Sequence, residues 1–586
     1  LCIPRVVAAA TFTVNRTLDL PDISPGDGVC AAGPSIPGVP DACTLRAAIM
    51  EANALGGTEP HVINLPEGIF ELTRVRPDPF PGLTEDDIQL SNSEGAIDHD
   101  GFNDLDIGVS VEIIGVGEGR TIVQARGQDR VFHVLHRSRA DFRVPAHVRL
   151  ARLTVRGGSS VNRGSGIFFE RVREAILDDV TVEENRGPAL FHHDGVNYTA
   201  VGGGVHSQAR DLFVNRSTMR NNIAGAGGGL LVFGGWATVR DSTFSGNIAL
   251  NTGGGSSTLV GGLHGMGGGI AVFDTPASRT VLDLRGSTLT GNRALDGGGL
   301  AAWGHAQVVN STLSGNSATS RGGGAYVRTP PAGGLSQFEF TTVVNNTADT
   351  GGGVYREQFE RSSFTLVRSI VALNSPENCA PPAGARPLSG GHNLEDTSTC
   401  GFTFATDLPN QAPRLGPLAD NGGETETHAL LSGSPAIDRA GTSAYHVDQR
   451  GVRRPQGSAM DIGAVENLRF SFTPYRIPDR FNIVFGFSLT LEITGTSGAT
   501  IRSIAAGSPD MKLTVKMDKS GRIATVSASG LNIDVDKLKQ TTGQKRPVLF
   551  YVEVDAKGEG SEFVVIAEPR FDAVIKDVTK LPIDQK

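Results

Sequence analysis

The sequence predicts an all-β fold, a right-handed parallel β-helix in which short strands stack coil upon coil. Glycine is unusually frequent, at 76 of 586 residues, and it gathers in tight clusters. These clusters mark an internal repeat of roughly 25–30 residues, a period that fits one coil of a solenoid. Between the clusters, apolar and polar residues alternate over short runs, which is the periodicity of strands.

The repeat is clearest in the middle of the chain. Successive copies read VNRSTMRNNIAGAGGGL, VRDSTFSGNIALNTGGG, LRGSTLTGNRALDGGGL, VVNSTLSGNSATSRGGGA and EFTTVVNNTADTGGGV. The clusters end at Gly204, Gly229, Gly269, Gly299, Gly324 and Gly353. No stretch between them has the length and pattern of an amphipathic helix, so a helical solenoid is excluded. One coil cannot bury its inward face alone, whereas stacked coils share a continuous core.

An asparagine recurs at one place in every copy of the repeat. Its positions are Asn222, Asn247, Asn292, Asn316 and Asn346. Stacked asparagine side chains can hydrogen-bond along the axis of a β stack, so we predict a structural ladder. A row of amides that binds a ligand is the alternative.

The start of the chain predicts a cap on the β-helix. Residues 1–10 contain the run Val6-Val7-Ala8-Ala9-Ala10, which is similar to the end of a signal peptide. Residues 11–59 hold one amphipathic stretch, CTLRAAIMEANAL, in which Leu45, Ile49 and Ala52 share a face. A helix there would cover the first coil, as solenoid ends require.

The five cysteines indicate an oxidising compartment. Two local pairs, Cys30 with Cys43 and Cys379 with Cys400, lie in loop-like stretches and predict two disulfides. Metal-binding spacings such as CxxC are absent from the sequence. Cys2 is left over, and it either belongs to a removed leader or carries a lipid.

Two stretches resemble known families. The segment PGDGVC…CTLRAAIMEANA, followed by VINLPEGIFELT, resembles the N-terminal segment of bacterial CSLREA-type proteins. The strings RLGPLADNGGETETHALLSGSPAIDRA and DQRGVRRPQGSAMDIGAVE are similar to the C-terminal segment of the choice-of-anchor Q family. The resemblance implies a secreted, often surface-attached bacterial parallel β-helix of the pectin-lyase-like (PbH1-repeat) class, mostly without an assigned biochemical role.

Residues 60–466 are therefore predicted to form the β-helix together with a closing segment. In that segment we expect Asp438, Asp448, Arg450, Arg454 and Asp461 to form a buried ion-pair network that closes the last coil. Buried charges are tolerated when they are paired, so a capping role is favoured over catalysis.

Residues 467–586 differ in composition from the rest. The first lysine of the chain is Lys512, and the segment alternates strand-like runs such as MKLTVKM and VLFYVEVDA with turn signals. This pattern predicts a β-sandwich domain. Such a domain could anchor the rod, bind a partner or mediate assembly, and a passive end cap is the alternative.

Charge and hydropathy exclude some partners. The net charge is −9, which argues against the basic footprint of a nucleic-acid-binding protein. No run of about 18 apolar residues occurs, so no transmembrane segment is predicted. We expect a secreted or cell-surface protein whose partner is an extracellular protein or a polysaccharide.

Two clusters are candidate sites of chemistry. His192, His193 and Asp194, with Arg186 nearby, are a lyase-like set in which histidine could act as general base, although a turn insertion is favoured. A second set of close carboxylates could hold Ca²⁺, with solvated loop charges as the alternative. Its members are Asp98, Asp100, Asp104 and Asp106.

Three functions follow from these observations. The first is a non-enzymatic β-helical rod for adhesion, matrix formation or extracellular assembly, without a cofactor. The second is a polysaccharide lyase or glycoside hydrolase of the pectate-lyase-like class, which requires clustered Asp, Arg or Lys in a groove. The third, a carbohydrate-binding module, is disfavoured because the chain has 2 Trp and 6 Tyr.

Overall fold

The computed structural model divides the chain into two units. The first covers residues 1–455 and 459–466, and the second covers residues 456–458 and 467–586. The structure describes residues 9–32, 42–57, 59–74, 104–127, 129–135, 147–160, 163–187, 191–193, 196–198, 200–250, 264–275, 278–328, 335–357, 363–380, 386–467, 471–474, 487–494, 499–506, 512–517, 523–529, 548–556 and 559–567. Each unit is treated by itself.

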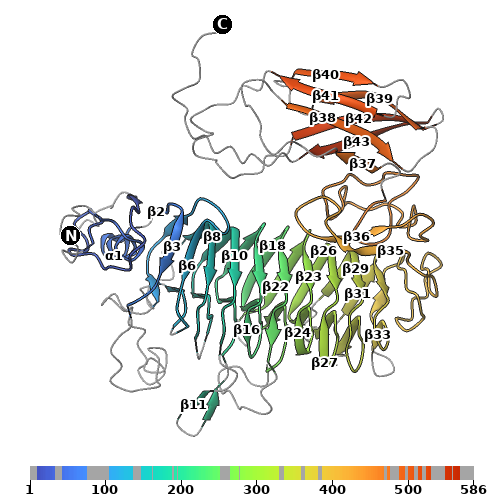
Figure 1. Ribbon diagram of the computed structural model, residues 1–586. Coiled ribbons are helices and arrows are strands. Elements are labelled where there is room, and N and C mark those ends of the chain that lie inside the picture. The colour runs from blue at the N-terminus through green and yellow to red at the C-terminus, as the bar shows by residue number, and fades with distance from the viewer. Residues whose placement is uncertain are drawn as a thin grey trace, which may run out of the picture. The chain divides into compact units, whose positions relative to one another are not determined.

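The first unit is a parallel β-helix (Figure 1). Strands of successive coils pair in parallel and in register, so the expected class of fold is present. Within the described residues the largest sheet has 18 strands. They are β1 (Thr11–Thr13), β2 (His61–Asn64), β3 (Gly68–Glu71), β5 (Val111–Ile114), β6 (Thr121–Gln124), β8 (His147–Arg156), β10 (Glu174–Glu183), β14 (Asp211–Asn215), β15 (Thr218–Arg220), β18 (Gly235–Arg240), β19 (Thr243–Ser245), β22 (Thr280–Arg285), β23 (Thr288–Thr290), β26 (His305–Ser314), β29 (Leu335–Val344), β31 (Ser363–Val367), β32 (Ile370–Ala372) and β34 (Leu388–Ser389).

A second sheet of ten described strands lies on another side of each coil. Its strands, in spatial order, are β4 (Leu105–Ile107), β7 (Phe132–Leu135), β9 (Ile167–Glu170), β13 (Val205–Ser207), β17 (Leu230–Phe233), β21 (Ile270–Phe273), β25 (Leu300–Trp303), β28 (Ala325–Arg328), β30 (Val354–Glu357) and β33 (Cys379–Ala380). A third sheet joins β16 (Ile223–Ala224), β20 (Ile248–Ala249), β24 (Arg293–Asp296) and β27 (Ser317–Arg321). Alternate residues of these strands point into one shared core, where each fully buried leucine or valine contributes about 2 kcal/mol.

The glycine clusters form the corner that leads into the ten-stranded sheet. Gly227, the first of one triplet, has φ +59°, a left-handed conformation that side chains disfavour. A Cβ on Gly228 would lie 2.6 Å from the carbonyl oxygen of Gly268 in the next coil, and one on Gly229 would lie 2.6 Å from that of Gly269. The first glycine therefore sets the turn, and the other two permit the coils to approach.

The predicted asparagines are buried and hydrogen-bonded to one another. The amide Nδ2 of Asn247 donates to Oδ1 of Asn292 at 2.9 Å, and the same bond repeats at 2.9–3.0 Å along the stack. The ladder extends beyond the predicted residues, from Asn185 at one end to Asn378 at the other. It ends where Asn378 donates to the carboxylate of Asp396 at 2.7 Å.

A second polar ladder consists mainly of serines. The backbone N–H of Ser217 donates to Oγ of Ser242, and the pattern continues through Ser287 to Ser311. Further along the stack, Ser369 donates its N–H to Asn393, which in turn donates to the carboxylate of Asp407 at 2.9 Å.

The first coil is covered by α1 (Leu45–Leu55), as the sequence predicts. Thr44 caps this helix by accepting a hydrogen bond from the Ala47 N–H, which satisfies one unpaired helix donor. Leu45, Ile49 and Ala52 are buried in the main core. The disulfide between Cys30 and Cys43 ties the cap to the chain that precedes it.

The last coil is covered by the segment around the second disulfide. Cys379 and Cys400 are bonded to each other, and both pack with Phe402 against the main core. Beside them Glu395 is fully buried and accepts the N–H of Cys400 at 3.0 Å. Burial raises the pKa of Glu395 to about 7.

The closing segment differs from the prediction that it caps the last coil. It contains the hairpin β35 (Leu415–Ala419) and β36 (Thr427–Leu430), and it lies along the side of the large sheet (Figure 1). Its bonds reach several coils, from Gly286, Thr288 and Thr312 to Ser314 and Thr342. Polar side chains on the outer face of that sheet give the segment its partners.

The charged residues expected in the closing segment do come together. Arg450 pairs with Asp448 at 2.7 Å, and the backbone N–H of Asp438 donates to Asp461 at 2.6 Å. Arg454 is fully buried, and its partner is Glu466 at 2.8 Å, which the sequence did not indicate. The Arg454 guanidinium also lies 4.2 Å from the ring of Phe340 on β29, so the network joins the segment to the β-helix.

The second unit contains two antiparallel sheets in its described part. One has the order β37 (Ser471–Pro474), β38 (Phe487–Thr494), β41 (Ile523–Ser529), β40 (Lys512–Met517). The other has the order β39 (Ala499–Ala506), β42 (Val548–Ala556), β43 (Glu559–Ala567). This all-β character agrees with the alternating pattern of the sequence.

Removing one rung of the asparagine ladder tests its contribution to stability. Asn292→Ala deletes four hydrogen bonds and leaves buried backbone and amide groups unpaired, at a cost of about 3 kcal/mol. We expect a lower midpoint of urea unfolding, followed by circular dichroism. The exposed neighbour Arg293→Ala is the control, and an equal midpoint for the two variants contradicts a stabilising ladder.

The buried Glu395 predicts a pH dependence of stability. The unfolded chain loses this proton near pH 4.5, whereas the folded chain keeps it until about pH 7. The free energy of unfolding should therefore fall between pH 4.5 and 7, by up to about 3 kcal/mol from this group. Glu395→Gln should remove that part of the decrease in urea unfolding, and exposed Glu118→Gln should not.

Candidate functional site

The outer face of the ten-stranded sheet carries clusters of ionisable and aromatic side chains. One outward-pointing residue of each strand stacks on its counterparts in the neighbouring coils, and six of these ten residues stand two places after a glycine triplet. In register they are Asp106, His133, Phe168, His206, Leu231, Ala271, Ala301, Tyr326, Tyr355 and Ala380. The column is acidic and imidazole-bearing at its N-terminal end, apolar in the middle and aromatic at its C-terminal end.

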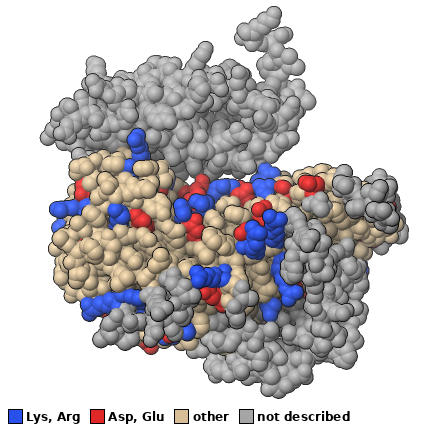
Figure 2. All heavy atoms as spheres, turned by 180° about the vertical axis from the view of Figure 1, so that it is seen from behind, with Lys and Arg blue, Asp and Glu red and all other residues tan. Residues whose placement is uncertain are grey.

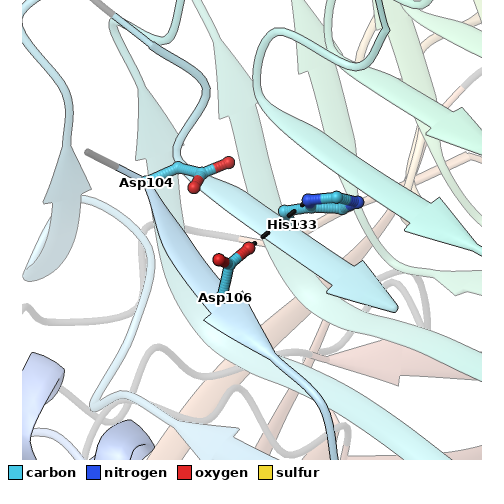
Figure 3. Close-up of side chains that lie close together, drawn as sticks. All are labelled: Asp104, Asp106 and His133. Atoms are coloured by element: carbon cyan, nitrogen blue, oxygen red, sulfur yellow. Dashed lines mark ion pairs between the residues drawn. The ribbon is translucent and has the colours of Figure 1, made fainter. Parts of the chain in front are cut away.

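Two acids and a histidine lie together at the N-terminal end (Figure 3). Asp106 lies on strand β4, and Asp104 is the residue directly before this strand. In the neighbouring strand β7, His133 lies opposite Asp106. The Nδ1 atom of His133 is 3.3 Å from Oδ1 of Asp106, and its Nε2 is 3.4 Å from Oε2 of Glu170. Both ring nitrogens of this buried histidine thus face carboxylate oxygens.

Arginine side chains complete the cluster. The Nε of Arg130 lies 2.7 Å from Oδ2 of Asp104, and both side chains are almost fully buried. The guanidinium groups of Arg130 and Arg163 lie over the ring of Phe168, 5.6 and 5.9 Å from its centre. Two guanidinium groups therefore lie over one aromatic ring, and one of them is paired with a buried carboxylate.

The electrostatics of the cluster follow from burial and pairing. Burial lowers the pKa of Arg163. Burial also holds the pKa of His206 well below its usual range, and the nearby charges of Arg163 and Arg130 add to this effect. Burial opposes ionisation of Glu170, but His133, Arg171 and Arg163 together outweigh this effect and lower the pKa of that carboxyl. His206 is consequently neutral, and Glu170 is ionised.

The described residues fit a calcium site poorly. Ca²⁺ takes six to eight oxygen ligands, whereas this cluster offers two carboxylates and an imidazole within reach of one ion. The guanidinium of Arg130 already occupies the carboxylate of Asp104. Asp98 and Asp100, the other two acids proposed from the sequence, lie outside the described residues. Among the placed side chains, ion pairing is the role that the geometry supports.

The histidine cluster expected from the sequence is only partly described. His192 and His193 lie on β11 (Phe191–His193), which forms a hairpin with β12 (Val196–Tyr198), in agreement with a turn insertion. Asp194 is outside the described residues. Arg186 is exposed on the β-helix, where its backbone bridges to Ile223 of the next coil.

The C-terminal end of the sheet brings together residues that the sequence reasoning missed. Trp303, at the end of β25, lies under the guanidinium of Arg328 at 4.0 Å. The rings of Tyr326 and Tyr355 stack with centres 5.7 Å apart, and Arg321 lies 4.9 and 5.3 Å from them. Aligning residues after each glycine triplet, as in GGGLAAW, GGGAYVR and GGGVYRE, would have shown this grouping.

The outer face of the large sheet is an array of ion pairs. Arg149 on β8 bonds to Glu112 of the preceding coil at 3.1 Å and to Asp178 of the following coil at 2.8 Å. Arg220 pairs with Glu183 at 2.6 Å in the same way. The acids named here are held by basic residues of neighbouring coils.

Among the described residues, no helix is long and apolar enough to cross a membrane.

Comparison with known proteins assigns no family. No family model matches the chain, and no curated protein matches it either. The crystal structure of Dettilon tailspike protein (gp208) aligns with a TM-score of 0.30 and 12% identity, over 83% of this chain and 85% of that one. A TM-score this low does not establish a shared fold. The identification of the parallel β-helix therefore rests on the strand pairing described above.

We expect the buried pair Asp104–Arg130 to stabilise the first coils without a metal ion. Asp104→Asn leaves the Arg130 charge buried beside a neutral partner, which costs about 3 kcal/mol or more. The thermal midpoint of this variant should lie below that of the wild type. The difference between the two midpoints should be the same in calcium chloride as in EDTA. A wild-type midpoint that rises with calcium, and fails to rise in Asp104→Asn, would instead show a calcium site.

Proposed function

We propose that this protein is a secreted or cell-surface structural and interaction protein. Its β-helix acts as a rigid rod for adhesion, for a matrix or for an extracellular assembly. The partner we propose is an extracellular protein or a polysaccharide bound on the side faces of the coils.

The observation that supports this proposal best is the pairing of charged groups on the two largest sheets. Hydrolysis of a glycosidic bond needs two carboxyl groups, one of them kept as a proton donor, on either side of the bond. The acids of the N-terminal cluster instead face Arg130 and His133, and those along the large sheet are bonded to arginines. Such pairs fix neighbouring coils to each other and leave each of these carboxylates bonded to a basic side chain.

Other features support an extracellular interaction role. Two disulfides persist in oxidising compartments, and the two ends of residues 10–466 resemble segments of secreted bacterial surface proteins. Basic and acidic side chains are intermixed on the face seen in Figure 2, whereas a nucleic-acid partner would favour a basic patch. Among the described strands of the second unit, β37, β40, β39 and β43 lie at the edges of their sheets, where a partner could add a strand.

The test separates binding from catalysis. The full chain, incubated with a panel of acidic polysaccharides and calcium, should leave their chain length unchanged by size-exclusion chromatography. A column of immobilised cell-surface polysaccharide or matrix protein should nevertheless retain it. Release of short oligosaccharides contradicts the proposal and favours a lyase or hydrolase, in which case His193→Ala should reduce the rate.

A further inference from the structure

A column of threonines runs along the outer face of the large sheet. Each threonine is followed by a core residue such as Phe244, so the threonine side chains point outward. In register, they are Thr154, Thr181, Thr218, Thr243, Thr288, Thr312 and Thr342. The closing segment binds the end of this column. The hydroxyl of Thr288 donates to the backbone carbonyl of Glu426 at 2.6 Å, and that of Thr342 accepts the backbone N–H of Ala464 at 3.0 Å.

The corner beside this column binds the same segment. The side-chain amide of Asn310 donates to the backbone carbonyl of Val447 at 2.8 Å. In a later coil the guanidinium of Arg368 donates to the carbonyl of Ala440 at 3.0 Å. These contacts are made to main-chain groups, which an extended polypeptide presents at every residue and a polysaccharide lacks. The face is therefore already a binding surface for polypeptide within this chain.

The same surface continues in the two coils that precede the part bound by the closing segment. Thr243 and Thr218 extend the column there, and both side chains are partly exposed. The corner also keeps its shape, because Arg216 and Asp241 have φ of +44° and +51°, the left-handed conformation that Asn310 adopts further along. Two accessible hydroxyls therefore stand where the neighbouring coils bind main-chain groups.

Exposed arginines flank these two hydroxyls. The side chains of Arg220 and Arg240 are 44% and 46% exposed, whereas those of their acidic partners, Glu183 and Asp283, are 12% and 20% exposed. Each arginine keeps its partner, but a guanidinium has five N–H donors and can bind a second anion on its outer side. The surface of these coils thus presents guanidinium groups outward, with the acids beneath them.

The closing segment indicates which charge this surface attracts. Its stretch beside the threonine column reads Glu424-Thr425-Glu426-Thr427, which is acidic and rich in hydroxyls. The hydrogen bond to Asp179, with smaller effects from Asp178 and Glu424, raises the pKa of Arg216. An acid of the bound segment therefore already acts on an arginine of the coils that continue the surface.

We propose that Thr218, Thr243, Arg220 and Arg240 form a docking strip for an extended acidic segment of a partner protein. The hydroxyls bind main-chain groups of the partner, and the guanidinium groups bind its carboxylates. The chain as a whole has a net charge of −9 and repels acidic polymers, so binding must come from a local surface. This inference deepens the proposed function, on which it rests, because it names the partner as a protein and gives the place where it binds.

The test compares two acidic polymers that differ in their backbones. Poly-L-glutamate is the probe, because it carries carboxylates on a polypeptide that self-repulsion keeps extended. Polygalacturonate carries carboxylates on a chain without amide groups. Calorimetric titration of the full chain, at equal carboxylate concentration, should show poly-L-glutamate binding about tenfold more tightly. Equal affinities would overturn the proposal and favour an anionic polysaccharide as the partner.

Variants of the strip show whether it is the binding surface. Thr218→Val combined with Thr243→Val removes both hydroxyls and keeps the β-branched shape that suits a strand. Binding of poly-L-glutamate should weaken about tenfold, the loss expected for two neutral hydrogen bonds. Arg240→Gln should weaken it about threefold, as for an exposed ion pair, and Asp283 keeps its bond to Arg285 at 2.7 Å.

Two matched controls lie on other parts of the β-helix. Thr347→Val removes an exposed hydroxyl, and Arg171→Gln removes an exposed guanidinium that follows the ten-stranded sheet's β9. Both controls should bind poly-L-glutamate as the wild type does. The thermal midpoints of the strip variants should equal those of the controls, which separates a loss of binding from a loss of folding.

The outcomes distinguish this inference from the proposed function. If poly-L-glutamate does not bind the wild type, or if the strip variants bind it as tightly as the controls, the docking strip is overturned. Retention of the chain on a matrix column would then leave the proposed function standing. Release of short oligosaccharides from polygalacturonate is a separate readout, and it would contradict the proposed function and, with it, this inference.

Discussion

The close approach of successive coils at the glycine corner is the constraint on which the β-helix depends. There, a single added carbon on Gly228 or Gly229 would collide with a backbone carbonyl of the neighbouring coil. Because the corners are so tight, the strands on either side stay in register and the polar side chains behind them meet at hydrogen-bonding distance. The asparagine and serine ladders, the outward columns and the shared core all follow from that spacing.

The same constraint explains what the sequence could and could not predict. The repeat predicts the coils and the asparagine ladder, because both return at the same point relative to each glycine triplet. Asn185 and Asn378 were missed because no complete copy of the repeat surrounds them. The lateral position of the closing segment was also missed, since its partners, such as Thr288 and Thr342, lie more than a hundred residues away.

The candidate sites show a further limit of sequence reasoning. Asp104 and Asp106 were selected as neighbours in sequence, yet their partners Arg130 and His133 come from the next coil. Trp303, Tyr326 and Tyr355 are separated by intervals of unequal length, so their common face becomes visible only when the strands are aligned on the preceding glycine triplets. In a β-helix, the residues of one site come from successive coils. Because the loops of these coils differ in length, the residues of a site are not separated by a fixed interval in the sequence.

The two polar ladders also give the rod a direction. In each ladder the hydrogen bonds that join successive members all run in the same direction, with each donor facing the C-terminal end of the β-helix. Both ladders finish at that end on a carboxylate, Asp396 in one and Asp407 in the other. An extra coil placed beyond these residues would have to bury two anions, whereas a duplicated coil in the interior would simply extend both chains of bonds. The two aspartates therefore favour an end of the β-helix at this point over the addition of further coils beyond it.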